Sequence, residues 1–310
     1  MHTETENGIQ ASALLLKEHN LVDKIWDVQA GLLIERSQLL AAIMQADYIL
    51  LGENHDNISH HMNQAWLIDN LVKHDRGASV SFEMIDNRQG DLIINKNITS
   101  SIVLIDTLNQ FESSWNYETY YSILFESVIQ AGFKIYPANI DRQTLTHSVM
   151  QDNQNLSPRL RQILSQTSLP PDQKTILQKG IIESHCGMLD TKTVDQMIEM
   201  QRIRDATMAA SLLNSEADIK VLVAGINHVR KDHGVPIYLL QENEKATIIS
   251  VAPIEVDADH NDIIAYEKHW KNESLPFDYV WFTARAKRPT EKEFCTQLKK
   301  HFKGKHDKQS

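Results

Sequence analysis

Continuous apolar runs alternate with segments of helical periodicity along most of the chain. Short runs that are apolar at every position are typical of strands buried on both faces of a parallel sheet. Segments with apolar residues three or four positions apart indicate helices that cover such a sheet. Ser37 is the expected N-cap of the first of these helices, over residues 38–45. The expected strands cover residues 48–51, 78–82, 134–138, 219–224, 246–252 and 279–282, and the expected helices cover 38–45, 58–73, 195–213 and much of 86–131. This alternation predicts an α/β protein, a three-layer α/β/α fold with a mostly parallel central sheet.

One stretch interrupts the alternation. Residues 143–190 are polar, contain three prolines and have no strand-like run, so we expect a helical, cap-like excursion that spans 143–215 with the helix after it. We expect a single α/β domain over residues 21–298. The ends, residues 1–20 and 299–310, are expected to be flexible.

Polar residues that could catalyse a reaction or bind a ligand follow the ends of the predicted strands. Two strands run into Gly-x-x-His, which places His55 and His228 just beyond glycines, and Glu53 precedes the first of these histidines. Glu83 and Asn139 follow two other strands. Because the carboxyl ends of parallel strands share one edge of the sheet, these side chains are expected to converge there.

Such a set supports two kinds of chemistry. Glu53, His55 and His228 could bind a divalent metal, since carboxylate and imidazole are suitable ligands. Without a metal, a carboxylate could orient an imidazole that acts as a base on water, with Glu83 as a further member of the catalytic set. A third interpretation is that the polar groups only satisfy strand ends and helix caps.

Further residues are candidates for supporting roles around this set. His61 and Gln64 lie on the inward stripe of the helix over 58–73, where they could contribute to a site or only hydrogen-bond the preceding loop. Their neighbour His60 is expected to be solvated. Arg230 or Asn139 could stabilise developing negative charge. The supporting set consists of His61, Gln64, Asn139, Arg142, Arg230 and Asp232.

Composition narrows the function and the compartment. The chain has 31 Lys and Arg against 41 Asp and Glu, a net charge of −10, which argues against a nucleic-acid binder. Cys186 and Cys295 are too few for a disulfide scaffold, although they could pair in an oxidising compartment. No apolar h-region begins the sequence and no apolar run reaches 18 residues. We therefore expect a cytosolic protein or an exported one without its leader.

Several blocks in order resemble the ChaN-like haem-binding, iron-regulated lipoprotein family. The first is Leu-Gly-Glu-Asn-His-Asp, which ends at Asp56 and is followed by His61 and Gln64. The others fall within residues 81–84, 115–120, 139–142, 185–187, 201–209, 225–236 and 279–283. The resemblance covers residues from about 21 to about 295.

The resemblance implies a haem-binding protein of bacterial iron or haem acquisition. It implies an exported protein, periplasmic or anchored to the outer membrane through a lipid that this chain lacks, with outer-membrane haem-uptake components as partners. A haem held at the surface would allow a homodimer, and Tyr120 and His185 are the candidate haem ligands. The wider superfamily, with Tiki and erythromycin-esterase proteins, implies as an alternative a metal-dependent hydrolase that uses the Glu/His crevice.

Overall fold

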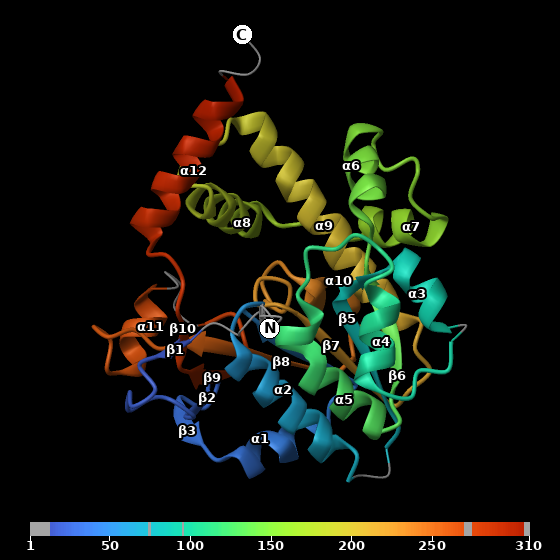
Figure 1. Cartoon of the computed structure of the whole chain (residues 1–310), viewed down its shortest axis with the longest axis vertical. Helices are drawn as coiled ribbons and strands as arrows, with labels where there is room; N and C mark the ends of the chain where they lie inside the picture. Colours follow the sequence, from blue (N-terminus) through green and yellow to red (C-terminus); the bar gives the residue numbers. More distant parts are fainter. Residues whose placement is uncertain (1–12, 74–75, 95, 270–274, 307–310) are drawn as a thin grey trace, which may run out of the picture.

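The central feature of the structure, a computed structural model, is an eight-stranded sheet within the described residues 13–73, 76–94, 96–269 and 275–306 (Figure 1). The strand order is β3-β2-β9-β8-β4-β7-β5-β6. In that order the strands are Leu32–Ile34, Ile25–Asp27, Tyr279–Thr283, Ile248–Glu255, Tyr48–Glu53, Ile219–Gly225, Ala78–Asp86 and Lys134–Asn139. A separate pair joins β1 (Leu14–Leu15) to β10 (Arg285–Ala286).

The sheet is mostly parallel. All pairings from β9 through β6 are parallel, whereas β2 pairs antiparallel with both β3 and β9 at one edge. Gly31 turns the chain between β2 and β3 with a φ of +66°, a conformation that glycine adopts without strain. The predicted fold class and each of the six predicted strands are confirmed.

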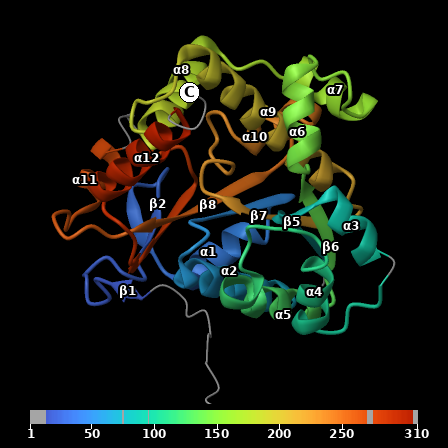
Figure 2. The ribbon, with the colours of Figure 1, turned by 45° about the horizontal axis from the view of Figure 1, so that its top comes forward.

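Helices cover both faces of the sheet, which completes three layers (Figure 2). One face carries α1 (Arg36–Ile43), α2 (Ile58–Leu71), α3 (Asn87–Ile94), α4 (Ser101–Leu108) and α5 (Ser122–Gln130). The other carries α6 (Arg142–Met150), α7 (Pro158–Gln166), α9 (Thr191–Leu213), α10 (Val235–Glu242) and α11 (Ile263–His269).

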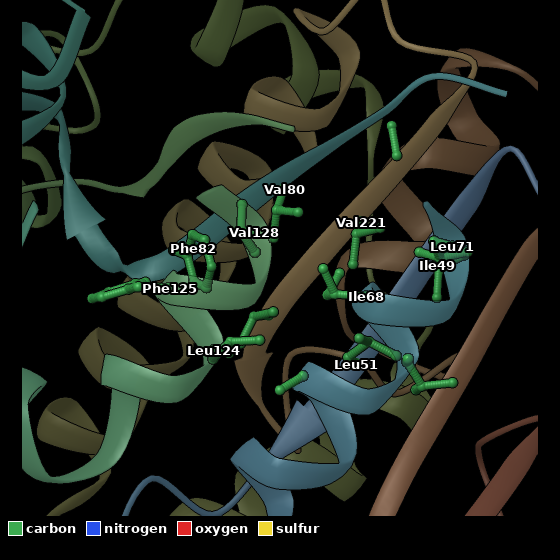
Figure 3. Close-up of a cluster of buried hydrophobic side chains, with 14 of the residues drawn as sticks. Ile49, Leu51, Ile68, Leu71, Val80, Phe82, Leu124, Phe125, Val128 and Val221 are labelled. Atoms are coloured by element: carbon green, nitrogen blue, oxygen red, sulfur yellow. The ribbon is translucent and has the colours of Figure 1, made fainter. Parts of the chain in front are cut away.

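Strand alternation distributes the core between the two faces. Ile49 and Leu51 of β4 pack with Ile68 of α2 and Phe125 of α5, as Figure 3 shows, whereas Leu50 packs on the opposite face against the α9 layer. Because successive strand residues point to opposite faces, Glu53 continues the row of Ile49 and Leu51 toward α2.

The cap-like part of the fold is smaller than the predicted excursion of 143–215. Helices α6 and α7 pack into the main core, while α8 (Pro171–Ser184) has a small core of its own with the first half of α9. A disulfide between Cys186 and Cys295 joins the α8–α9 connection to α12 (Glu291–His306). None of the residues 291–300 of α12 is buried, so the disulfide is a principal attachment of this helix.

Two boundaries differ from expectation. Helix α1 begins at Arg36 with Glu35 as its N-cap, because Glu35 and Gln38 form a capping box, so the expectation of Ser37 as N-cap was wrong. Helix α12 includes residues 299–306, which we expected to be flexible, while residues 1–12 and 307–310 lie outside the described residues. Among the described helices, none is both long and apolar enough to cross a bilayer.

Candidate functional site

Glu53 is the centre of a buried hydrogen-bond cluster on the α2 face of the sheet. Its Oε1 accepts hydrogen bonds from the Tyr121 hydroxyl at 2.6 Å and from Nδ1 of His55 at 2.8 Å. Its Oε2 accepts one from the Gln64 amide at 3.1 Å. Burial opposes ionisation, but the neighbouring imidazoles of His61 and His55 and the Tyr121 hydroxyl lower the pKa of Glu53 to about 2. The carboxylate is therefore charged at neutral pH.

His61 and Gln64 hold the end of β4 from helix α2. The Gln64 amide also donates to the carbonyl of Gly52 at 3.0 Å, and Nε2 of His61 lies 3.3 Å from the carbonyl of His55. Burial lowers the pKa of His61. Nδ1 of His61 has no hydrogen-bond partner among the described residues and lies 3.6 Å from Oε2 of Glu53. Both residues contact the loop and the carboxylate together.

Glu83 belongs to a second cluster, on the α9 face of the sheet. Its Oε2 accepts a hydrogen bond of 2.7 Å from the backbone N–H of Gly225, and its Oε1 lies 3.4 Å from Nε2 of His228. Nδ1 of His228 donates to Asp205 of α9 at 2.6 Å, and the Gln201 amide contacts the same nitrogen at 2.9 Å. Although burial opposes it, the carboxylates of Glu83 and Asp205 raise the pKa of His228 to about 10, so this ring is an imidazolium.

His55 links the two clusters. Because ionised Glu53 only accepts hydrogen bonds, Nδ1 of His55 carries a proton, and although burial opposes it, the hydrogen bond with Glu53 and the charge of Glu83 raise the pKa of the ring. In the neutral form of His55 the lone pair is therefore on Nε2. A Cβ atom at Gly225 would lie 3.1 Å from Nε2 of His55 and 3.5 Å from Oε2 of Glu83. The ring of Trp115 stands edge-on at 4.7 Å, and the His55 side chain is 40% exposed. Nε2 therefore faces the space above Gly225, which Glu83 also borders.

A pocket of about 410 Å³ opens at this edge of the sheet. Its lining is mainly polar, with carboxylates, imidazoles, amides and one guanidinium, whereas pockets for large apolar ligands are lined mostly by apolar side chains. The lining residues are Glu53, Asn54, His55, Asp56, Gln201, Gly225, Ile226, Asn227, His228 and Arg288.

The predicted metal set does not form a metal-binding group in this arrangement. Across the described residues, no three or more His, Cys, Asp and Glu side chains are placed to hold one ion. The donor atoms are instead paired with one another: Glu53 with His55, and His228 with Asp205 and Glu83.

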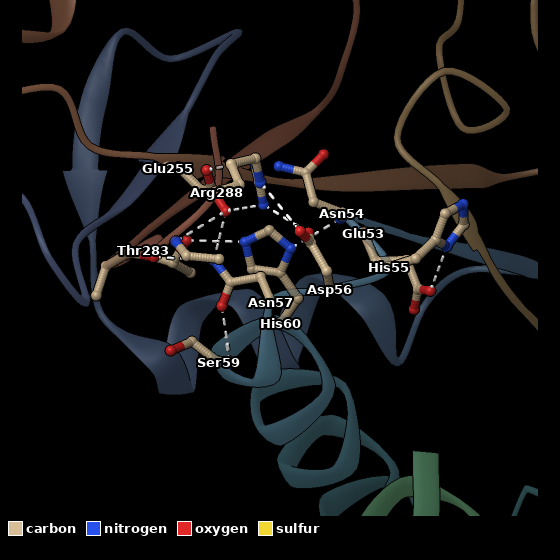
Figure 4. Close-up of polar contacts among 12 residues, drawn as sticks. Glu53, Asn54, His55, Asp56, Asn57, Ser59, His60, Glu255, Thr283 and Arg288 are labelled. Atoms are coloured by element: carbon tan, nitrogen blue, oxygen red, sulfur yellow. Dashed lines mark hydrogen bonds and ion pairs between the residues drawn. The ribbon is translucent and has the colours of Figure 1, made fainter. Parts of the chain in front are cut away.

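The loop after β4 is also held by contacts on the side of β8 and β9 (Figure 4). His60 is fully buried: its Nδ1 accepts from the backbone N–H of Asn54 at 2.9 Å, and its Nε2 donates to the Thr283 hydroxyl at 2.9 Å. The expectation that His60 is solvated was therefore wrong. Arg288 binds both Asp56, at 2.6 Å, and Glu255, at 2.8 Å. These contacts join the loop to the ends of β8 and β9.

The remaining predicted residues occupy more varied positions. The Asn139 amide donates to the carbonyl of Glu83 at 2.9 Å, and Arg230 is buried in a two-bond pair with Asp232. Arg142 is exposed at the first turn of α6 and does not line the pocket. Two further predicted residues, the haem-ligand candidates, also lie outside the pocket lining.

Those two candidates lie on different parts of the molecule. Tyr120 is partly exposed in η1, a π-helical turn over Tyr117–Tyr121, and its ring centroid is 6.0 Å from that of His61. His185 ends α8, next to the disulfide, and its Nδ1 donates to the carbonyl of Ile181 at 2.8 Å.

Two participants were not identified as site residues from the sequence. Tyr121 is one of several aromatic residues between Phe111 and Phe125, and nothing in its spacing separates it from Tyr117 or Phe125. Asp205 gave a clearer signal, because it shares an otherwise buried face of α9 with Gln201 and Met208. A carboxylate on an inward-facing helical stripe needs a partner, and that partner is His228.

Comparison with known proteins identifies relatives of this arrangement. The model of the family described as haem-binding uptake, Tiki superfamily, ChaN matches residues 39–239. Among solved structures, that of ChaN from Campylobacter jejuni, which describes cofacial haem binding, is similar in fold. It has a TM-score of 0.65 and 24% identity, over 83% of this chain and 95% of that chain. A mutant erythromycin esterase EreC in its open conformation is 14% identical over 84% of this chain and 82% of that chain, with a TM-score of 0.42. No curated protein matches the sequence.

Proposed function

We propose that this chain, which belongs to the ChaN family of haem-binding uptake proteins within the Tiki superfamily, binds haem in bacterial iron acquisition. The observation that carries the proposal is the family match, which spans four of the eight strands of the sheet, β4 to β7, and both halves of the Glu/His site. Haem would supply the iron that such a protein transports, and this chain would supply its axial ligand and an apolar surface.

The aromatic surface at η1 suits haem better than the polar pocket does. Tyr120 and Trp115 are partly exposed there, and Met62 of α2 and Ile123 of α5 are exposed apolar residues on the two helices that pack beside η1. A tyrosine oxygen is a suitable ligand for ferric haem. We therefore propose Tyr120 as the axial ligand.

His185 is the second candidate ligand. Its Nδ1–H is held by the carbonyl of Ile181, which leaves Nε2 as the nitrogen with a lone pair, as iron ligation requires. It lies just before α9, however, and Gln201 of the pocket is ten residues into that helix, a rise of about 15 Å. A haem at His185 would therefore bind the tip of the cap.

A titration of the purified full chain with hemin tests the proposal. We expect a saturable Soret band that differs from that of free hemin. Spectra that remain the sum of free hemin and protein at every ratio would overturn it.

We propose that the protein is exported to the periplasm or carried on the outer membrane by a lipid anchor, where it passes haem to outer-membrane uptake components. The Cys186–Cys295 disulfide supports this location, because disulfides persist in oxidising compartments and are rare in the cytosol. Thiol labelling of the protein in intact cells tests it. Two reactive thiols in the native protein would contradict the proposal.

A second candidate function is the hydrolysis of an ester or amide, favoured by one observation: two histidines, each hydrogen-bonded to a buried carboxylate, line the same pocket. Nε2 of neutral His55 could take a proton from water as the water oxygen bonds to a carbonyl carbon. The His228 imidazolium would stabilise the negative charge that develops on the carbonyl oxygen, and the proton would then pass from His55 to the leaving group. This scheme uses no metal.

A panel of p-nitrophenyl esters of increasing chain length tests this second function. We expect hydrolysis that falls at least about 100-fold in His55→Gln, the range for loss of a general base. Hydrolysis equal to the uncatalysed rate for every ester, or a variant as active as the native protein, would contradict it.

A further inference from the structure

The turn that carries Tyr121 has an unusual backbone. Residues Tyr117–Tyr121 form a π-helix that leads directly into α5, and single π-turns inside helical segments are frequent at functional sites. The two tyrosines at its ends reach two different strands: the Tyr117 hydroxyl donates to the carbonyl of Met84 at 2.7 Å, and the Tyr121 hydroxyl donates to Glu53 at 2.6 Å. The turn therefore holds the ends of β5 and β4, the strands that carry Glu83 and Glu53.

The Tyr121 hydroxyl is placed at the junction between Glu53 and His55. It lies 2.6 Å from Oε1 of Glu53 and 3.4 Å from Nδ1 of His55. With the Gln64 amide on Oε2, both oxygens of the carboxylate are held by donors, so the carboxylate cannot rotate without losing a hydrogen bond. The orientation that keeps both of these donors also presents Oε1 to Nδ1 of His55.

We propose that Tyr121 is a positioning residue of the pocket: its hydroxyl fixes Glu53 so that the neutral form of His55 keeps its proton on Nδ1 and its Nε2 lone pair above Gly225. The proposal rests on the hydrolytic function only in that the lone pair would accept a proton from water. The positions of Tyr121, Glu53 and His55 rest on their hydrogen bonds alone. Tyr121 acts through Glu53 and does not line the pocket.

Without the Tyr121 hydroxyl, Glu53 loses the donor that holds its Oε1 beside His55. The Gln64 amide then holds only Oε2, so the carboxylate can rotate about that contact and lose its alignment with Nδ1 of His55. The other groups that face His55 are Glu83 of β5, His228 after β7 and Trp115 before η1. Of these, only Glu83 could accept a proton from the imidazole, and it lies on the Nε2 side. Loss of the Tyr121 hydroxyl should therefore allow the alternative Nε2–H tautomer of His55.

The tautomer is measured directly by long-range ¹H–¹⁵N correlation of the histidine rings in the labelled full chain, with His55→Gln to assign the signals. In the native protein, at a pH above the raised pKa of His55, we expect one protonated nitrogen, Nδ1, and one unprotonated nitrogen, Nε2. In Tyr121→Phe we expect the two ¹⁵N shifts to move toward each other as both tautomers become populated. The phenylalanine ring keeps the edge contact with His61, at 4.5 Å, and the stack on Phe125, at 6.0 Å.

Tyr117→Phe is the matched control. It removes a hydroxyl from the same turn, one bonded to the Met84 carbonyl, and should leave the His55 ring shifts unchanged. If both variants leave the ring shifts unchanged, the positioning role is overturned. If Tyr121→Phe does not fold, the native spectrum still decides, because a mixture of His55 tautomers there would contradict the proposal.

The ester panel tests the hydrolytic function separately from the positioning role of Tyr121. If an ester in the panel is cleaved, Tyr121→Phe should lower kcat by about tenfold with KM unchanged, as expected when a transition-state interaction is weakened. If no ester is cleaved but the tautomer changes as described, hydrolysis fails and the positioning role stands.

Discussion

Gly225 lies directly against the imidazole of His55: a Cβ atom at position 225 would be 3.1 Å from Nε2, closer than most side-chain contacts allow. The glycine therefore keeps open the space into which the His55 lone pair and the Glu83 carboxylate face. Substitution by alanine should close that space and shift His55 by a few tenths of an ångström.

We predict that Gly225→Ala lowers any hydrolysis in the pocket by at least about tenfold, because misplaced catalytic groups are costly even when the shift is small. Kinetics on the ester panel measure this. Gly180→Ala in α8 is the control: nothing lies within 4 Å of its Cβ, so activity should be unchanged and stability should rise by up to about 1 kcal/mol. Equal activities of the two variants would contradict the prediction.

Much of this site could be predicted from the sequence. Strands that are apolar at every position identify a parallel sheet, and the carboxyl edge of such a sheet gathers Glu53, His55, Glu83 and His228, as the structure shows. The face to which each carboxylate points could not be predicted. Strands buried on both sides give no polar face as a reference, so only the structure separates Glu53, on the α2 face, from Glu83, on the α9 face.

The residues that surround these two glutamates and two histidines were harder to predict. Tyr121 is as buried as the core aromatics, and only its hydroxyl contact with Glu53 distinguishes it. His60 lies at the polar start of a helix, where solvation is the usual outcome. Its burial depends on Thr283, more than 220 residues later, and local sequence does not report such a contact.

Tyr120 and His185 offer separable predictions for haem. We expect Tyr120→Phe to weaken hemin binding by at least about tenfold, because the phenolate oxygen is lost as a ligand while the ring remains. His185→Ala should bind hemin as the native chain does. Parallel titrations followed at the Soret band measure both. The opposite pattern would place the haem at the cap, and unchanged affinity in both variants would exclude both ligands.

Stability should fall as the pH rises above neutrality because of His228. Its pKa is about 10 in the folded chain against about 6.5 in an unfolded one, so the folded state binds the extra proton between these values. The stabilisation is complete below about pH 6.5 and is lost as the pH approaches 10, at a rate of at most about 1.4 kcal/mol per pH unit. Urea unfolding at pH 7, 8 and 9 measures this. A free energy of unfolding that is constant or rising over this range would contradict it.

Breaking the disulfide should free helix α12 from the cap while the central sheet stays folded. Cys186 and Cys295 are 109 residues apart, so the cross-link contributes about 5 kcal/mol at most by restricting the unfolded chain. Because no residue from 291 to 300 is buried, we expect α12 of the Cys186→Ser, Cys295→Ser double variant to be cleaved by trypsin while the sheet remains intact. The oxidised native chain under the same conditions is the control. Equal cleavage of the two proteins would show that other contacts hold α12.

The most direct test of the central claim is an equilibrium hemin titration of the full chain, followed by removal of unbound hemin on a desalting column. The account predicts a Soret band that saturates and that elutes with the protein, together with quenching of tryptophan fluorescence, since Trp115 lies five residues from Tyr120. Hemin that separates completely from the protein, with no saturable band and no specific quenching, would contradict the assignment of haem binding to this chain.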